Sequence, residues 1–395
     1  MQEQSNITHP GHTGNGYIRY TIVTMLFIVT AFNFAGRTTM SIAGPAVSNQ
    51  LHVDAKALGY IFSAFGWSYV LGQIPGGALL DRFGTKNVYA TSIFLWSLFT
   101  LLQGFVGHFN TFTAIVLLFS LRLLLGLAES PCMPGNSRIV AAWFPASERG
   151  TACMIFNSAQ YFALVLFAPI MGWIVSRFGW PYLFYAMGSF GIMLSFVWMK
   201  TVYSPTNHPL VTQAEVEYIA GNGGVLDLDG RNGSTRGAFH LASIRQLLAN
   251  RLLLGISIGQ YCIGALTYFF LTWFPVYLVQ ARGLSILHAG FAASVPALCG
   301  VGGSLIAGVV SDYLLRRGCS LTLARKAPII VGLLLSVSIV GCNYVSSTAA
   351  VIVIMSIAFF GKGVGAMGWT VVADASPSNM AGLNAAWRLS TAYPP

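Results

Sequence analysis

Long apolar runs alternate with short polar connections along the chain. Ten of the runs are long enough to cross a bilayer as helices, because a span requires about 20 apolar residues. Six of them precede a polar segment at 203–252 and four follow it. The runs cover about 21–45, 58–80, 88–107, 112–133, 151–175, 182–202, 253–278, 288–311, 327–345 and 348–372. The pattern predicts an all-α polytopic membrane protein.

Lysine and arginine gather in alternate connections. The N-terminal tail and the connections at 81–87, 134–150, 203–252 and 312–326 hold 13 of them, whereas the opposite connections hold only Lys56, Arg177 and Arg282. Cytoplasmic loops carry the excess of basic residues in membrane proteins. We therefore expect the tail at 1–20 and the central loop at 203–252 to be cytoplasmic.

The composition agrees with this class, since 55% of the residues are hydrophobic and 8% are charged. The net charge of +10 arises from the basic loops and does not indicate a nucleic-acid partner. The sequence contains no nucleophile–base constellation, cofactor loop or paired cysteine spacing. We expect neither an enzyme nor a cofactor or metal site.

The central loop contains one predicted helix. Thr212 and Glu215 have the spacing of a capping box, and an amphipathic stretch follows them. The glycines at 221–224 end this helix. They do not indicate a phosphate-binding loop, because no Lys-Ser or Lys-Thr pair follows.

Two charged residues lie inside the fourth run. Arg122 and Glu129 are seven positions apart, or about two helical turns, so they share one helix face. A charged side chain at the bilayer centre costs about 2.5–3.5 kcal/mol, so this face should line a bundle interior or a water-filled cavity. A cation and a titratable acid in one cavity would suit coupled transport of an organic anion and a proton. The alternative is a structural pair that only fixes helix packing.

The first run contains a third charge, Arg37, about sixteen residues from its start. A guanidinium group binds a carboxylate through two parallel hydrogen bonds and stays charged at every relevant pH. A sugar dicarboxylate would suit two such cations and several neutral polar groups. For Arg37 the alternative is a side chain that reaches toward the membrane interface.

A repeat relates the two parts of the chain. Gly77 to Asp81 follows the second run, Gly308 to Asp312 follows the eighth, and a basic cluster comes after each. The repeat predicts two related halves, each built on a six-helix plan, joined by the central loop.

Several motifs carry a resemblance to a known family. GGALLDRFGTK (76–86) and WFPASERGTA (143–152), on this span pattern, resemble the major facilitator superfamily. FNFAGRTTMSIAGPA, LRLLLGLAESPCMPGNSRIVAAWFP, NSAQYFA and FFGKGVGAMGW are similar to bacterial anion:cation symporters for sugar acids. The similarity extends over about residues 20–383 and is closest to glucarate/galactarate permeases, with galactonate and hexuronate transporters next.

The resemblance implies the fold, activity and setting of the protein. It implies a six-helix bundle at 21–202 and a second bundle at 253–395 in which the last two helices are missing. The activity expected is proton-coupled uptake of a sugar-acid dicarboxylate by alternating access. We expect a multi-pass monomer in the lipid bilayer of a bacterial inner membrane.

The resemblance also implies roles for individual residues. Glu129 is implicated in proton coupling, and Asp81 with Arg82 forms a gating loop. The substrate-binding positions expected are Arg37, Arg122, Tyr69, Gln160, Gln260 and Trp369. Lys362 is a further candidate for substrate binding. For Asn157 and Tyr261, a hydrogen bond between helices explains a polar residue at apolar depth at least as well as substrate binding does.

The chain departs from the family at two places. Relatives carry an acid immediately before the first-span arginine, and Gly36 stands there instead, which leaves Arg37 without this partner. The sequence also ends as NAAWRLSTAYPP where relatives continue into an eleventh helix, which suggests a frameshift. The alternative to a working transporter is therefore a truncated, non-transporting remnant.

Overall fold

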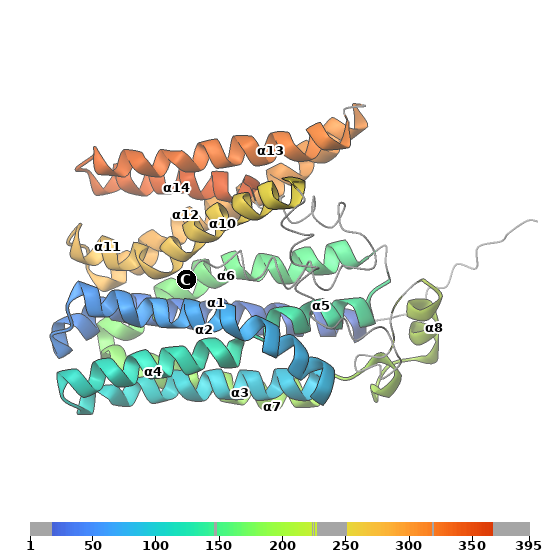
Figure 1. The fold of residues 1–395 in the computed structure, drawn as a ribbon, viewed down its shortest axis with the longest axis horizontal. Helices are drawn as coiled ribbons and strands as arrows, with labels where there is room; N and C mark the ends of the chain where they lie inside the picture. The colour runs from blue at the N-terminus through green and yellow to red at the C-terminus, as the bar shows by residue number, and fades with distance from the viewer. Residues whose placement is uncertain are drawn as a thin grey trace, which may run out of the picture.

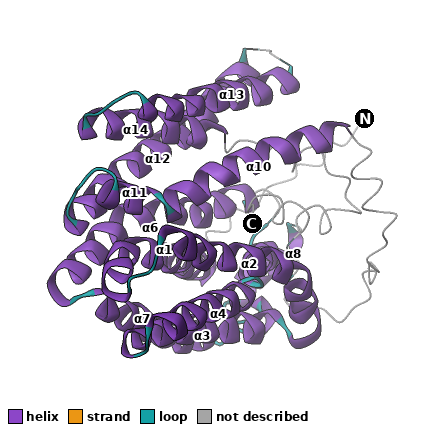
Figure 2. Cartoon of the chain, turned by 60° about the vertical axis from the view of Figure 1, so that its left-hand side comes forward, coloured by secondary structure: helices purple, strands orange, loops and turns teal. Residues whose placement is uncertain are grey.

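Long helices lie side by side through the computed structural model (Figure 1), which describes residues 18–145, 148–222, 224, 226, 251–317 and 320–365. No strand occurs among these residues (Figure 2). The first group of helices is α1 (Ile18–Leu51), α2 (Ala55–Phe83), α3 (Thr85–Gln103), η1 (Gly104–His108), α4 (Thr111–Glu129), α5 (Cys132–Trp143), α6 (Arg149–Phe178) and α7 (Trp180–Thr201).

The second group lies beyond the central loop. It consists of α10 (Arg251–Thr272), α11 (Phe274–Gln280), α12 (Ile286–Arg316), α13 (Leu321–Ser336), η3 (Val337–Asn343) and α14 (Thr348–Gly365). The loop itself contributes η2 (Pro205–Asn207) and α8 (Gln213–Gly221). The tail before Ile18 and the end of the chain after Gly365 lie outside the described residues.

Each of the ten predicted runs coincides with helix as far as the structure describes it, which for the tenth run is to Gly365, but two of the runs are broken. The fourth run stops at Glu129 and resumes as α5, so residues 132–143 are helical where the sequence predicted a loop from 134. The seventh run bends by 45° between α10 and α11. Both breaks come next to a proline, Pro131 and Pro275, which cannot donate a helical hydrogen bond.

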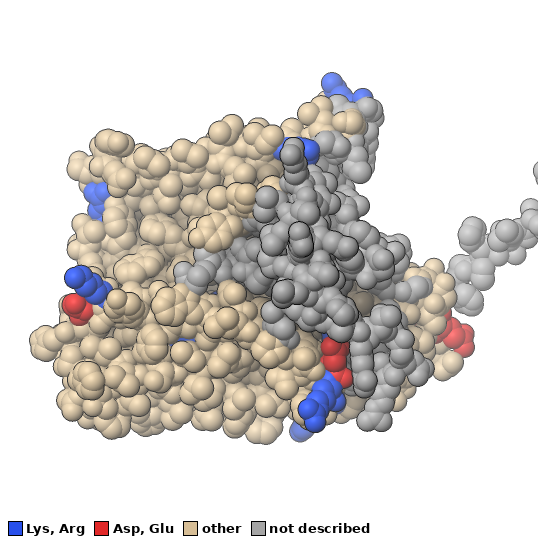
Figure 3. Space-filling view, in the orientation of Figure 1, with Lys and Arg blue, Asp and Glu red and all other residues tan. Residues whose placement is uncertain are grey.

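The described helices are suited to a membrane. Eight are long and apolar enough to cross one, and the bent pair of α10 and α11 would make nine. α2 is not among them, because it contains polar residues such as Ser63, Ser68 and Gln73. Large apolar side chains such as Phe112, Leu71 and Val309 are exposed, and the charged side chains visible in Figure 3 lie toward the two ends of the bundle. An apolar belt between two polar ends is the surface that lipid requires.

Helix starts and turns follow local chemistry. Asp54 and Asn110 accept hydrogen bonds from the backbone N–H groups of Ala57 and Thr113, which caps α2 and α4. Gly84 alone connects α2 to α3 with a φ of 86°, a backbone conformation that favours glycine.

Glycine also sets how closely the helices pack. A Cβ at Gly126 of α4 would lie 2.5 Å from the carbonyl oxygen of Phe65 and 3.0 Å from the backbone nitrogen of Tyr69, both on α2. A Cβ at Gly188 of α7 would lie 2.7 Å from the backbone of Leu101 on α3. Small residues at such contacts let helix backbones approach each other, as membrane helices require.

The two groups pack against each other along α6 and α12, and further contacts join them at the end of the bundle opposite α8 (Figure 1). Ser41 of α1 donates a 2.5 Å hydrogen bond to the carbonyl oxygen of Thr272. The Tyr268 hydroxyl donates one of 2.6 Å to the carbonyl oxygen of Phe62. The Phe62 ring also contacts the edge of Trp273 at a centroid distance of 5.2 Å. We call these three contacts, between α1 or α2 and the α10–α11 segment, the end gate.

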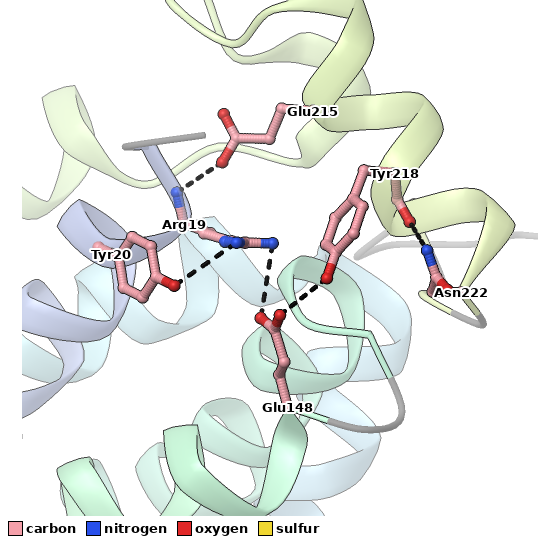
Figure 4. Close-up of polar contacts among 6 residues, drawn as sticks. All are labelled: Arg19, Tyr20, Glu148, Glu215, Tyr218 and Asn222. Atoms are coloured by element: carbon pink, nitrogen blue, oxygen red, sulfur yellow. Dashed lines mark hydrogen bonds and ion pairs between the residues drawn. The ribbon is translucent and has the colours of Figure 1, made fainter. Parts of the chain in front are cut away.

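The predicted loop helix is confirmed as α8, and it is fastened to the first group (Figure 4). Thr212 caps it by accepting from the backbone N–H of Glu215 at 3.3 Å. The Glu215 carboxylate does not complete the capping box, because it accepts from the backbone N–H of Arg19 at 3.1 Å. The Glu148 carboxylate accepts a 2.8 Å hydrogen bond from the Tyr218 hydroxyl and forms an ion pair with the Arg19 guanidinium at 3.5 Å.

Replacement of Gly126 by alanine should destabilise the protein. The added methyl group meets backbone atoms of α2 that cannot rotate away, and such overpacking typically costs about 1–3 kcal/mol. We expect Gly126→Ala to lower the melting temperature of the purified protein. Gly77→Ala is the matched control, since a Cβ there meets nothing within 4 Å, and equal melting of the two variants would contradict the packing.

Candidate functional site

The charged residues of α4 point into the protein. The buried residues of this helix are Ala114, Leu118, Arg122, Leu125, Gly126 and Glu129, which recur at helical spacing along one face. Arg122 is 3% exposed and Glu129 is 2% exposed. The seven-residue spacing therefore predicted their shared buried face correctly.

Glu129 pairs with Arg37 of α1. The Nε and Nη2 atoms of Arg37 each lie 2.5 Å from Oε1 of Glu129. Arg37 is itself buried. Gly36 removes the adjacent acid that the family resemblance implies for Arg37, but α4 supplies another carboxylate from 92 residues further along the chain.

Aromatic rings of α1 and α2 surround the two guanidinium groups. Arg37 lies over the rings of Phe34 and Tyr69, at 4.7 and 4.6 Å from their centroids. Phe65 lies near both cations, 5.4 Å from Arg37 and 5.2 Å from Arg122. Desolvated cation–π contacts are each worth about 2 kcal/mol, so the rings offset part of the cost of burying the two charges. Tyr69, expected at the site, is thus in contact with it.

Arg122 differs from Arg37 because it has no anionic partner. Among the described residues it makes no ion pair, and its Nε has no hydrogen-bond partner. A buried guanidinium left in this state carries a large desolvation penalty. An anion that entered the site would find five N–H donors in a planar fork.

Two residues that the sequence analysis did not single out lie at this site, Asn33 and Tyr268, and a third, Gln73, is buried on α2. Asn33 lies next to the Glu129 carboxylate, and the buried amide of Gln73 has no hydrogen-bond partner within the described ranges. Asn33 stands four residues before Arg37 and Gln73 four after Tyr69, so helical spacing could have identified both. Tyr268 of α10 interacts electrostatically with Arg122, and no feature of the sequence indicated this contact.

The remaining expected binding residues are placed only in part. Gln160 lies on α6 and is partly buried, and Tyr261 of α10 is 49% exposed. Gln260 falls on α10 and Asn157 on α6, but their side chains are outside the described set. Trp369 lies beyond the described part of the chain.

The gating residues lie at the end of α2. Asp81 forms an ion pair with Arg138 of α5, and the Arg82 guanidinium lies 5.2 Å from the Phe83 ring centroid. Both contacts are inside the first helix group. In this conformation, no described contact of Asp81 or Arg82 reaches the second group.

The family pattern described as "Major Facilitator Superfamily" matches residues 26–393. The chain belongs to the major facilitator superfamily. Its relatives there are transporters, so the protein is a transporter and not an enzyme.

Several similar proteins are named as sugar-acid transporters. The chain is 59% identical to the probable galactarate/D-glucarate transporter GudP of Bacillus subtilis, over 93% of this chain and 81% of that protein. It is 58% identical to the Escherichia coli K12 protein of the same description, over 93% and 82%. A D-galactonate transporter of Escherichia coli O6:H1 is 37% identical, over 93% and 84%.

Solved major facilitator structures share the fold. A D-xylose–proton symporter superposes with a TM-score of 0.68 at 15% identity, covering 95% of this chain and 87% of that one. A bacterial homologue of the lysosomal transporter Spinster, in an inward-facing conformation, gives a TM-score of 0.70 at 16% identity, covering 95% and 79%.

A double-mutant cycle should show that Arg37 and Glu129 stabilise each other. Arg37→Gln or Glu129→Gln alone leaves an uncompensated buried charge, and loss of one partner of such a pair costs about 3–5 kcal/mol. The double variant removes both charges and should lose less stability than the sum of the single variants. The measurement is thermal unfolding of the purified protein.

The control cycle uses the exposed pair of Asp81 and Arg138, which should contribute less than about 1 kcal/mol. Strict additivity of the Arg37 and Glu129 substitutions would show that the buried pair does not form.

Proposed function

We propose that this protein is a symporter that takes up a sugar dicarboxylate of the galactarate/glucarate type together with protons. The observation that carries the proposal is Arg122, a buried guanidinium without an ion pair, beside a buried arginine–glutamate pair. The two GudP relatives support the substrate, since their identity to this chain, 58–59%, exceeds the 37% of the galactonate transporter.

Arg122 would bind one substrate carboxylate. Its fork of donors matches a carboxylate bidentately, and the Tyr268 hydroxyl, which interacts electrostatically with Arg122, could meet a sugar hydroxyl group. The anion would replace the missing partner of Arg122, so binding would remove the penalty of the unpaired charge. Specificity follows because buried polar groups remain unsatisfied when the ligand lacks the matching groups.

Glu129 would carry the coupled proton. As a carboxylate it neutralises Arg37, and a proton on it would break that ion pair and free the guanidinium to attract the substrate. A bound anion near Arg37 in turn competes with Glu129 and favours its protonation. The proton and the anion thus promote each other's binding, which is the reciprocal linkage that symport needs.

The end gate would close one side of the transport path. The end of the bundle opposite the gate would face the cytoplasm, as the basic residues of the central loop and the position of α8 support. The protein would lie in a bacterial inner membrane with its N-terminus on the cytoplasmic side. The closed gate then corresponds to an inward-facing state. Transport requires the gate to open as the two helix groups rock against each other, within a single chain acting as a monomer.

Arg122→Gln should abolish substrate uptake. The variant removes the charge but keeps a polar side chain of similar length, so binding of the carboxylate should fall at least 100-fold. The measurement is uptake of radiolabelled glucarate into proteoliposomes with an inward proton gradient. Arg177→Gln is the matched control at an exposed arginine, and uptake by Arg122→Gln equal to this control would refute the role of Arg122.

Glu129→Gln should separate substrate binding from proton coupling. Glutamine cannot exchange a proton, so the gradient should no longer drive accumulation, whereas exchange of external for internal glucarate should continue. The readouts are gradient-driven uptake and glucarate counterflow in the same proteoliposomes. Gradient-driven accumulation by the variant at the wild-type level would contradict the role of Glu129.

A further inference from the structure

One buried cation has no role in the transport mechanism above. Lys362 lies in the last turn of α14, and 3% of its surface is exposed. The ion pairs found among the described residues all involve other side chains. Lys362 is therefore a second buried cation that has no anionic partner among the residues described.

Two aromatic rings surround its ammonium group. The Nζ atom lies 4.6 Å from the ring centroid of Tyr161 and 4.8 Å from that of Phe359. Phe359 belongs to α14, but Tyr161 comes from α6 in the other helix group. Cation–π contacts compensate only part of the cost of burying an ammonium ion, so the site still favours an anion.

Tyr161 adds a second unused donor. Its side chain is buried, and its hydroxyl has no hydrogen-bond partner in the described part of the chain. An ammonium group from one helix group thus lies against a phenol ring of the other, whose hydroxyl is an unused donor. A carboxylate can accept hydrogen bonds from both at once.

Glycines fix the helices that present these groups. A Cβ at Gly300 of α12 would lie 2.9 Å from the Phe359 ring and 3.0 Å from the Tyr161 ring. Gly363 sits so close to α12 that a Cβ would lie 2.3 Å from the Gly300 carbonyl oxygen. The close contact of α12 with α14 holds Lys362 on a rigid element, as a binding residue requires.

The buried charges have the balance expected for a dianionic ligand. The described membrane helices bury the cations Arg37, Arg122 and Lys362 and the single acid Glu129. With Glu129 ionised, two positive charges remain without a partner. A ligand with two carboxylates would neutralise both, whereas a monocarboxylate would leave one.

We infer that Lys362 and Tyr161 bind the second carboxylate of the substrate, while Arg122 binds the first. Lys362 is then the residue that makes the protein prefer a sugar dicarboxylate over the monocarboxylate of the same sugar. Because the ligand touches Arg122 in one helix group and Lys362 in the other, it also draws the two groups together. The inference rests on the proposed function and names the residue that determines its substrate class.

The test compares glucarate with gluconate, which have six carbons each but two carboxylates and one, respectively. Isothermal titration calorimetry on the purified full-length chain gives the Kd of each. In the Lys362→Gln variant the preference for glucarate, expressed as the ratio of the two Kd values, should fall at least tenfold. Tyr161→Phe, which keeps the ring and removes only the hydroxyl, should lower the same ratio by a smaller factor.

Controls separate this inference from the proposed function. Lys200→Gln, at an exposed lysine, should leave both Kd values unchanged, and Arg122→Gln should weaken both ligands. Lys362→Met provides a second test if the glutamine variant does not fold. An unchanged ratio in a folded Lys362 variant overturns the inference and leaves the transporter intact. Failure of the wild-type protein to bind either ligand overturns the proposed function.

Discussion

The cost of burying charge in an apolar bundle determines how this protein is arranged. Arg37 and Glu129 come from helices far apart in the sequence, yet the Nε and Nη2 atoms of Arg37 each lie 2.5 Å from Oε1 of Glu129. This pairing offsets part of the cost of burying the two charges. The pair joins α1 to α4 and fixes the first helix group around its polar interior. Arg122 and Lys362 have no such partner among the described residues, so an anionic ligand bound there would offset the largest remaining cost of buried charge.

The packing of α2 against α4 makes this arrangement possible. Gly126 lies three residues before Glu129, and the missing side chain lets α2 approach at Phe65 and Tyr69. The Tyr69 ring contacts Arg37, and the Phe65 ring contacts both Arg37 and Arg122. A glycine that serves helix packing therefore also brings the aromatic rings to the cations. The site depends on the close helix contact as much as on its charged residues.

The sequence was sufficient to predict the helices and the buried face of α4, because both follow from periodicity and from the cost of charge in lipid. It was not sufficient to predict the partner of Glu129. The spacing along α4 placed Arg122 and Glu129 on one face of the helix. The Glu129 carboxylate nevertheless pairs with Arg37 of the neighbouring α1, because a side chain two turns away on the same helix is harder for it to reach. The substitution at Gly36 likewise looked like a loss because the compensating carboxylate lies on another helix. The interaction of Tyr268 with Arg122 depends on how the two helix groups pack against each other. Local patterns in the sequence do not determine that packing.

In the proposed mechanism, the distribution of charge between the two helix groups couples ligand binding to the relative movement of the groups. The first group holds Arg122 and the arginine–glutamate pair, and the second holds Lys362 in contact with Tyr161 of the first. A ligand with one carboxylate would satisfy a cation in one group only, and it would do little to favour a state in which the groups are close. A dianion bound as proposed would interact with cations in both groups, so its binding energy would depend on their relative position. A ligand shifts a conformational equilibrium only by its difference in affinity for the two states. The second carboxylate could thus supply the free energy for closure as well as the selectivity for the substrate.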